Sequence, residues 1–186
     1  MEIKLRRILA EDLAMYKYWQ LPEHQYHQFN GPYFKKASRA AIEKEMDQLA
    51  AALKRGDHNP LPQKKIISNL QNELLGEVSW YWKSEETNWL EIGIVIFDEK
   101  NWSKGIGKRA LQLWIKDLFT AKKELVRLGL TTWSGNLGMI CLAEKLGMKR
   151  EAEYRKARIV AGKYYDSISY GILRSEWEVI ENGNKG

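Results

Sequence analysis

The chain has 186 residues and a formal net charge of +6, with 44% hydrophobic and 29% charged residues, as is usual for a soluble globular protein. No stretch reaches the roughly 18 apolar residues that a membrane span needs, the first residues lack the pattern of a signal peptide, and the single cysteine, Cys141, excludes an intrachain disulfide. These features favour one domain over residues 1–186, in the cytoplasm.

The chain before residue 63 predicts one strand and two helices. Alternation over Glu2–Ile8 favours a strand, and apolar spacing over Glu11–Gln20 favours a short helix. Ser38 is a suitable N-cap for a second helix that ends near Lys54. The composition of residues 21–34 and 55–62 indicates irregular segments.

Three strands are predicted next. Lys64–Leu70 and Leu74–Trp82 form a hairpin. Trp89–Phe97 is a run of mostly apolar residues, rich in Ile and Val, that contains a single carboxylate, Glu91. Such a run is typical of a buried strand, so Glu91 is predicted to lie inside the sheet.

The rest of the chain alternates helices and strands. A helix over Gly105–Phe119 precedes a strand over Leu125–Trp133, which implies a parallel, right-handed crossover. A helix over residues 135–146 is followed by two long strands, Met148–Val160 and Lys163–Leu173. The predicted class is α/β (α+β): a mixed, mostly antiparallel central sheet of about seven strands, with helices on both faces and one parallel pair near its centre.

The turn before the third helix has the features of an anion site. Gly105 and Gly107 allow the backbone to approach a phosphate, and the first N–H groups of a helix have no partner within it. Lys104, Lys108 and Arg109 add positive charge there. The glycines, with Ala110, also satisfy a dinucleotide-binding fingerprint, but a polar turn separates them from the preceding strand, which that fingerprint does not allow.

Three motifs follow one another in a familiar order. The first motif begins with Glu91, continues through the end of its strand, and closes with Trp102-Ser103-Lys104-Gly105-Ile106-Gly107. The second is Asn136 followed by Glu144-Lys145-Leu146-Gly147-Met148, and the third is Gly162-Lys163-Tyr164-Tyr165-Asp166. Together they resemble the GNAT (Gcn5-related) N-acetyltransferases, most closely the branch with the ribosomal-protein N-terminal acetyltransferases. The resemblance covers about residues 74–177 and is weak over residues 1–73.

The resemblance implies acetyl-CoA as the cosubstrate. In the family, the central strand and its parallel neighbour separate at their ends, and the pantetheine arm of the donor lies between them. The donor contacts that this implies are Ile94, Val95, Ile96, Trp102, Ser103, Lys104, Gly105, Ile106, Gly107, Lys108 and Asn136. A backbone N–H near Val95 would polarise the thioester carbonyl.

Glu91 is the candidate general base, since its distance from Gly105 in the sequence matches family members that use a glutamate. Burial would raise its pKa towards a useful range. The alternative is a carboxylate with a purely structural role, and Glu77 is the next candidate base.

The general acid is unassigned, because Ala143 occupies the position where the family often has a tyrosine. Water is the favoured proton donor to the departing thiolate, and Tyr164 or Tyr165 is the alternative.

The leading hypothesis is an acetyl-CoA-dependent N-acetyltransferase that acts on a primary amine, either a protein N-terminus or a small amine. The alternative is a non-catalytic acyl-CoA-binding sensor on the same fold. A nucleic-acid-binding module is disfavoured because Lys and Arg are scattered. The remaining expectations are no metal, no nucleic-acid or membrane partner, and a monomer or homodimer.

Overall fold

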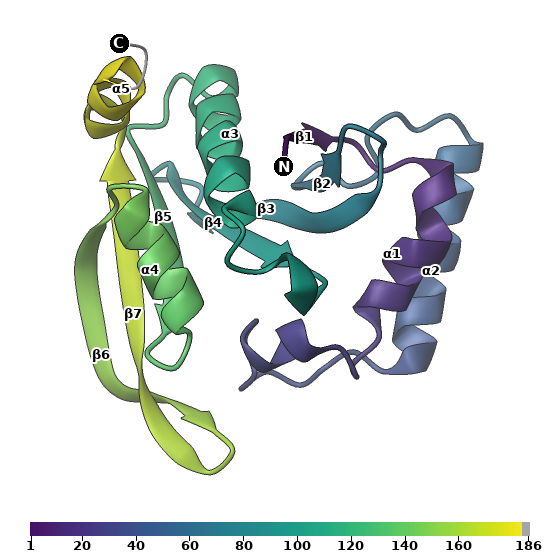
Figure 1. The fold of residues 1–186 in the computed structure, drawn as a ribbon, viewed down its shortest axis with the longest axis horizontal. Coiled ribbons are helices and arrows are strands. Elements are labelled where there is room, and N and C mark those ends of the chain that lie inside the picture. Colours follow the sequence, from purple (N-terminus) through teal and green to yellow (C-terminus); the bar gives the residue numbers. More distant parts are fainter. Residues whose placement is uncertain (184–186) are drawn as a thin grey trace. The chain divides into compact units, whose positions relative to one another are not determined.

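Seven strands form one mixed sheet in the computed structural model, which describes residues 1–183 (Figure 1). They are β1 Ile3–Arg6, β2 Lys64–Asn69, β3 Leu74–Ser84, β4 Trp89–Ile96, β5 Arg127–Trp133, β6 Lys149–Val160 and β7 Lys163–Leu173. Their order is β1-β2-β3-β4-β5-β7-β6. The β4–β5 pair is parallel, whereas the pairs β1–β2, β2–β3, β5–β7 and β6–β7 are antiparallel. The predicted fold class is confirmed.

Five α-helices accompany the strands in the described residues. They are α1 Leu13–Gln20, α2 Arg39–Lys54, α3 Ile106–Ala121, α4 Leu137–Lys145 and α5 Arg174–Gly183. The first four were predicted with boundaries close to these, and the Ser38 hydroxyl caps α2 by accepting from Ala41 N at 3.2 Å, as predicted. Helix α5 and the 3-10 turn Gln25–Gln28 were not predicted.

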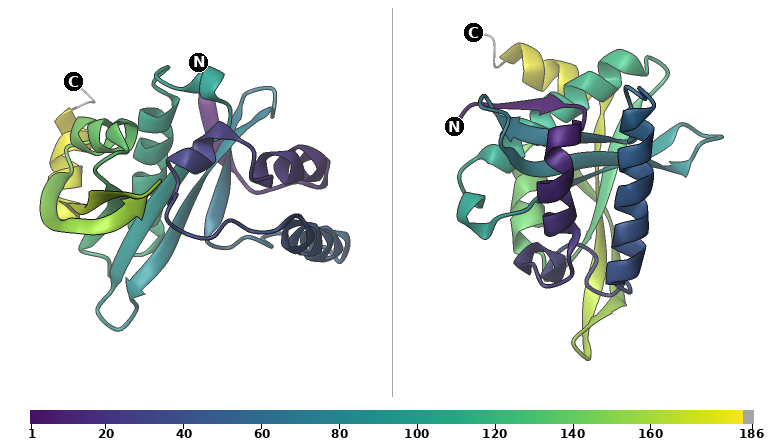
Figure 2. Two further views of the ribbon diagram at one scale, coloured as in Figure 1. Left: turned by 90° about the horizontal axis from the view of Figure 1, so that it is seen from below. Right: turned by 90° about the vertical axis from the view of Figure 1, so that its right-hand side faces the viewer.

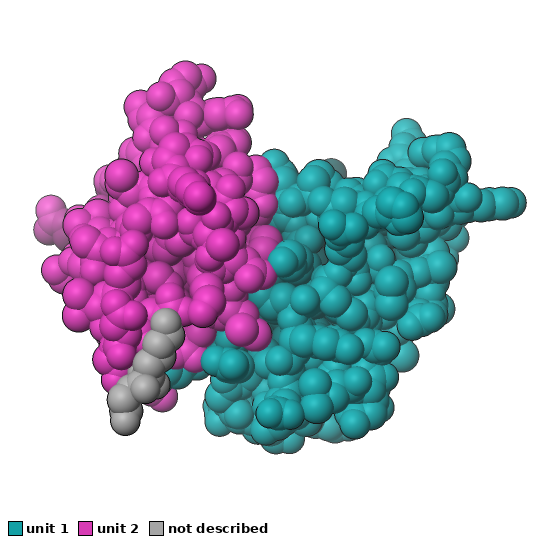
Figure 3. Space-filling view, turned by 90° about the horizontal axis from the view of Figure 1, so that it is seen from above, with its two compact units in different colours: residues 1–79, 94–110 teal, residues 80–93, 111–186 magenta. Residues whose placement is uncertain are grey.

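The chain divides into two compact units (Figure 3). Unit 1 contains residues 1–79 and 94–110, and unit 2 contains residues 80–93 and the described residues from Leu111 onward. Strands β3 and β4 and helix α3 contribute residues to both units. That the two units act as one domain stays a prediction.

Unit 1 has an aromatic core around Phe97, the residue that follows β4. Helices α1 and α2 lie side by side (Figures 1 and 2) and supply several of its members. The Phe97 ring stacks on Trp19 at 5.8 Å between centroids and meets Tyr16 edge-on at 6.3 Å. The buried cluster comprises Ile8, Tyr16, Tyr26, Ile42, Met46, Leu49, Ile66 and Phe97. This packing fixes the chain at the end of β4, just before the predicted anion site.

Unit 2 is built around β5, which pairs with β4 and, over its whole length, with β7. Its buried side chains come from strands and from helices α3, α4 and α5: Leu90, Leu111, Trp114, Ile115, Leu118, Leu128, Leu130, Ala143, Ile172 and Trp177. Past the Trp133–Ser167 pair, β6 and β7 continue as a two-stranded ribbon (Figure 1).

Arg174, the first residue of α5, holds the end of α3. Its guanidinium donates from Nη1 to Phe119 O at 2.9 Å, from Nη2 to Lys122 O at 2.9 Å and from Nε to Leu125 O at 2.8 Å. It also lies 4.6 Å from the centre of the Phe119 ring. The last carbonyls of a helix have no partner within the helix, and a cation suits the negative end of its dipole. Arg174 therefore caps α3 from a position far along the sequence.

Candidate functional site

The turn between β4 and α3 is held by its own side chains. The Asp98 carboxylate accepts from Lys100 N at 2.9 Å, which begins the 3-10 turn Glu99–Asn101. Trp102 Nε1 donates to Ile96 O at 2.9 Å, and the Trp102 ring meets Phe29 edge-on at 5.4 Å. Trp102 therefore anchors the turn to the end of β4, which gives it a structural role beside the predicted donor contact.

The start of α3 is exposed and basic. Ser103 and Gly105 adopt positive φ angles of 59° and 79°, which bring the chain sharply into the helix. A Cβ on Gly105 would meet nothing within 4 Å, so the backbone there faces open space. Lys104 and Lys108 are exposed, whereas the Ile106 side chain is buried, so Ile106 can offer a ligand only its backbone. Unpaired helix N–H groups and nearby cations are what a phosphate requires.

The last residues of β4, Ile94–Ile96, lie close to β3. A Cβ on Gly76 would collide with the Val95 carbonyl oxygen, so a glycine is required for the approach of the two strands. Phe97 N donates to Leu75 O at 3.0 Å directly afterwards. These contacts fix the backbone of the three residues that the resemblance assigns to the donor.

The parallel pairing of β4 with β5 is short. It aligns Leu90 with Leu128 and Glu91 with Gly129, and among the described residues of these strands it goes no further. The family resemblance implies such a separation beyond the paired residues.

Glu91 lies in unit 2, is only 2% exposed and has a partner on each oxygen. The Tyr81 hydroxyl donates to Oε2, and Thr131 Oγ1 donates to Oε1 at 3.0 Å. Lys83 Nζ lies 3.8 Å from Oε1. The expectation that Glu91 is buried in the sheet is confirmed, and its carboxylate is held in one position.

A second buried carboxylate, Glu77, lies in unit 1 with different partners. The Tyr16 hydroxyl donates to its Oε2 at 2.7 Å, and Lys64 Nζ donates to its Oε1 at 3.0 Å. Burial, reinforced by the Glu77 charge, raises the pKa of Tyr16 far above its ordinary value. Tyr16 is therefore a permanent donor, and the arrangement fits a structural ion pair better than a base.

Asn136 caps helix α4, because its Oδ1 accepts from Met139 N at 3.1 Å. This contact orients the amide at the start of the helix. Ala143, on the same helix, is fully buried and has no hydroxyl to donate.

The two tyrosines proposed as alternative acids lie on opposite faces of the β7 ribbon. Tyr164 pairs with Ile159 and is 64% exposed, whereas Tyr165 meets Trp133 edge-on at 4.8 Å. Adjacent strand residues point to opposite faces, so the two side chains have different surroundings. That either tyrosine reaches the reactive end of the donor stays a prediction.

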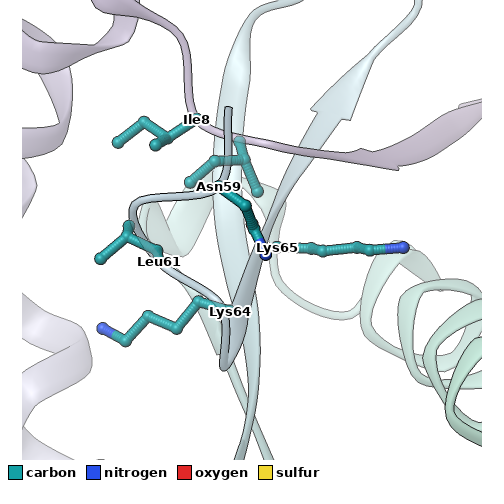
Figure 4. A pocket seen from close by; sticks show the side chains of 6 residues that line it. Ile8, Asn59, Leu61, Lys64 and Lys65 are labelled. Atoms are coloured by element: carbon teal, nitrogen blue, oxygen red, sulfur yellow. The ribbon is translucent and has the colours of Figure 1, made fainter. Parts of the chain in front are cut away.

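A shallow depression beside β2 involves none of the predicted site residues. It is lined by Ile8, Asn59, Leu61, Lys64, Lys65 and Ile66 (Figure 4). Lys64 and Lys65 point to opposite sides, and Lys64 is the residue that reaches Glu77.

Within residues 1–183, no three His, Cys, Asp or Glu side chains gather as metal ligands would. No helix in the same residues combines the length and hydropathy of a membrane span.

Tyr81, Lys83 and Thr131, the partners of Glu91, were missed in the sequence. A hairpin alignment of residues 74–82 with 89–97 would have brought Tyr81 towards Glu91. Thr131 required the parallel register of β4 and β5, which no local pattern reveals.

Comparison with known proteins gives one consistent result. A family model described as "Acetyltransferase (GNAT) domain" matches residues 2–149. A Bacillus subtilis relative, the SPbeta prophage-derived uncharacterized N-acetyltransferase YokL, is 34% identical over 76 residues, which span 41% of this chain and 42% of that relative.

Solved structures share the fold over nearly the whole chain. A Bacillus anthracis GNAT-family acetyltransferase has a TM-score of 0.72 at 20% identity, covering 95% of this chain and 97% of its own. A Vibrio cholerae spermidine N-acetyltransferase in complex with CoA and spermine has a TM-score of 0.73 at 15% identity, covering 95% and 98%. The ribosomal L7/L12 α-N-protein acetyltransferase RimL, in complex with coenzyme A, has a TM-score of 0.68 at 18% identity, covering 92% and 93%.

Proposed function

The chain belongs to the GNAT acetyltransferase family, and from this membership we propose that it is an acetyl-CoA-dependent N-acetyltransferase acting on a primary amine by direct transfer. The observation that carries the proposal is the exposed, basic start of α3, where Gly105 faces open space between Lys104 and Lys108. Such a helix start suits the pyrophosphate of a CoA donor.

The residues proposed to hold the donor are those that the family motif selects. Helix N–H groups of Ile106, Gly107 and Lys108 would bind the pyrophosphate, with the turn Trp102–Gly105 shaping the approach. The backbone of Ile94–Ile96 and the Asn136 amide would bind the pantetheine arm. Glu91 would accept the proton of the amine, which arrives mostly as ammonium. Water would protonate the departing thiolate, because Ala143 offers no hydroxyl.

A thiol-release assay with acetyl-CoA tests the proposal directly. The amine panel contains a tetrapeptide with a free α-amino group, an aminoglycoside and spermidine. Release that depends on one of the amines supports an N-acetyltransferase. Binding of acetyl-CoA with no release for any amine would favour the acyl-CoA sensor, for which the buried Ala143 is the supporting observation.

Acetyl-CoA is expected to raise the melting temperature. A ligand at a hundred times its Kd stabilises the folded state by about 2.7 kcal/mol. Gly107→Trp should abolish the rise, because the indole would cover the helix N–H groups. Differential scanning fluorimetry measures both effects.

Charge reversal separates ligand binding from folding. Lys108→Glu should weaken the rise, whereas Lys44→Glu, an exposed lysine on α2 of the same unit, should leave it intact. If NAD raises the melting temperature of the wild-type protein and acetyl-CoA does not, the donor assignment is contradicted.

Among acceptors, the free-amino peptide is expected to react faster than spermidine. Lys83 and Arg127 both lie over the Trp89 ring, at 6.0 Å and 5.2 Å, and Lys83 is the cation beside Glu91. Arg127 is in turn paired with Glu151. The charges of Lys83 and Arg127 therefore balance those of Glu91 and Glu151, and these four side chains leave no surplus negative charge to attract a polycation. We expect at least a tenfold preference in kcat/KM, a difference of about 1.4 kcal/mol. A preference for spermidine in the same assay would contradict this.

A further inference from the structure

Two tryptophans of β3, Trp80 and Trp82, hold a lysine ammonium against the faces of their rings. The ring centroids lie 5.6 Å apart, and the ring planes meet at 75°. Lys122 Nζ lies 4.9 Å from the centre of the Trp80 ring and 5.0 Å from that of the Trp82 ring. All three residues belong to unit 2, and all three are partly exposed. We call Trp80 and Trp82 the indole corner.

Aromatic faces, and not a countercharge, hold the ammonium in the indole corner. Within residues 1–183, no carboxylate pairs with Lys122, and no acceptor takes a hydrogen bond from its Nζ. By contrast, Arg127, which lies 5.2 Å from the centre of the Trp89 ring, is paired with Glu151. The corner therefore selects a cation through the negative faces of its rings.

Lysine fits this corner incompletely. Its ammonium has three N–H donors and is strongly hydrated, whereas an indole is a donor only and offers these N–H groups no acceptor atom. The three donors of Lys122 consequently depend on water. A quaternary ammonium group carries the same charge without any N–H group, and aromatic faces are the surfaces that bind it in proteins. The corner is therefore better matched to a quaternary ammonium than to the lysine that occupies it.

Only the side chain of Lys122 has to move for the corner to open. Its backbone is fixed at the end of α3, because its N donates to Leu118 O at 2.9 Å and its O accepts from Arg174 Nη2 at 2.9 Å. The ammonium stands at the end of a flexible four-carbon stem. The stem can turn towards water while the backbone keeps its position.

We propose that the indole corner is a binding site for a quaternary ammonium group, and that Lys122 occupies it when no such ligand is bound. The ligand group takes the place of Lys122 Nζ, against the faces of Trp80 and Trp82. The proposal is independent of the proposed acetyl transfer, in which these three residues have no assigned part.

Titration of the full chain with tetramethylammonium chloride tests the site. The readout is the pair of indole N–H signals of Trp80 and Trp82 in proton–nitrogen correlation spectra, assigned from Trp80→Leu and Trp82→Leu. Sodium chloride is lowered as the probe is added, so that the ionic strength stays constant. Both signals should shift saturably with tetramethylammonium and not with ammonium chloride. Trp82→Leu should abolish binding, whereas Trp89→Leu, a matched change on β4 of the same unit, should leave it unchanged.

Removal of the resident lysine gives the sharpest comparison. Lys122→Ala should bind tetramethylammonium about two- to fivefold more tightly, which is the range of one exposed cation–π contact expressed as a ratio of Kd values. Lys123→Ala removes the same charge from the neighbouring, exposed residue and should leave the Kd unchanged. The melting temperature of each variant establishes that it is folded.

Two further probes distinguish the sources of the group. Choline represents a free small molecule, and a peptide with one trimethyllysine, compared with its unmodified form, represents a methylated chain. Binding of either probe with the same dependence on Trp82 and Lys122 supports the site, and the tighter of the two identifies the source.

Three results overturn the proposal. The first is the absence of a saturable shift in Lys122→Ala, because the vacated corner then has no affinity for the group. The second is an equal response to ammonium chloride, or wild-type affinity in Trp82→Leu. The third is an equal gain in affinity for Lys122→Ala and Lys123→Ala, because the gain then comes from net charge and not from the corner.

Discussion

Glu91→Gln should lower the rate of acetyl transfer at neutral pH by about 10² to 10⁴, the usual contribution of a general base. Glutamine keeps the shape of the side chain and can still accept from Thr131, but it cannot take up a proton. The loss should become smaller above the pKa of the acceptor, about 8 for an α-amino group. The measurement is a pH profile of single-turnover rates at saturating acetyl-CoA.

Glu77→Gln is the matched control, because Glu77 is also a strand carboxylate with a tyrosine donor. It should leave the rate within about twofold of wild type and lower the melting temperature, since Lys64 loses the charge that balances it. If Glu91→Gln keeps neutral-pH activity while Glu77→Gln loses it, the roles of the two carboxylates are reversed.

Arg174→Ala should destabilise the protein by about 3 kcal/mol, because hydrogen bonds from a charged group are worth about 1.5–3 kcal/mol each and are not additive. The carbonyls of Phe119, Lys122, Lys123 and Leu125 lose their donor together. In a chain of this size the melting temperature should fall by about 6–12 °C.

Two substitutions define the specificity of that effect. Arg174→Lys should recover only a part of the stability, because one ammonium cannot reproduce the planar fork of donors. Arg155→Ala, at an exposed arginine of β6, should change the melting temperature by less than about 2 °C. Equal losses for Arg174→Ala and Arg155→Ala would show that α3 does not depend on its distant cap.

The elements that could be predicted from the sequence are those with strong local patterns. Apolar spacing gave α2 and α3 nearly to the residue, and Ser38 marked the start of α2 by its capping hydroxyl. Helix α5 was missed because charged residues surround its one buried aromatic, Trp177. Its position depends instead on Arg174, whose partners lie far away in the sequence.

The candidate site was predictable where the motif is contiguous. The turn from Trp102 to Gly107 carries its glycines, cations and helix start together, so sequence order alone reveals it. The partners of Glu91 come from β3 and β5, and their approach depends on strand register rather than on spacing along the chain. The Trp102–Ile96 hydrogen bond could not be predicted for a different reason: a tryptophan before the glycines could equally have faced a ligand.

The central place of β5 also limits the order in which the chain can fold during synthesis. One edge of β5 meets β4, which has already been made, but its other edge waits for β7, about 40 residues later. A nascent chain that stops before Lys163 exposes that edge, an arrangement that invites pairing with other chains. Closing the edge brings together segments distant in sequence, which slows folding. We therefore expect a chain shortened before β7 to aggregate or to be held by chaperones, and pulse-labelling hydrogen exchange on the full chain to show protection of β5 and β7 appearing together and late.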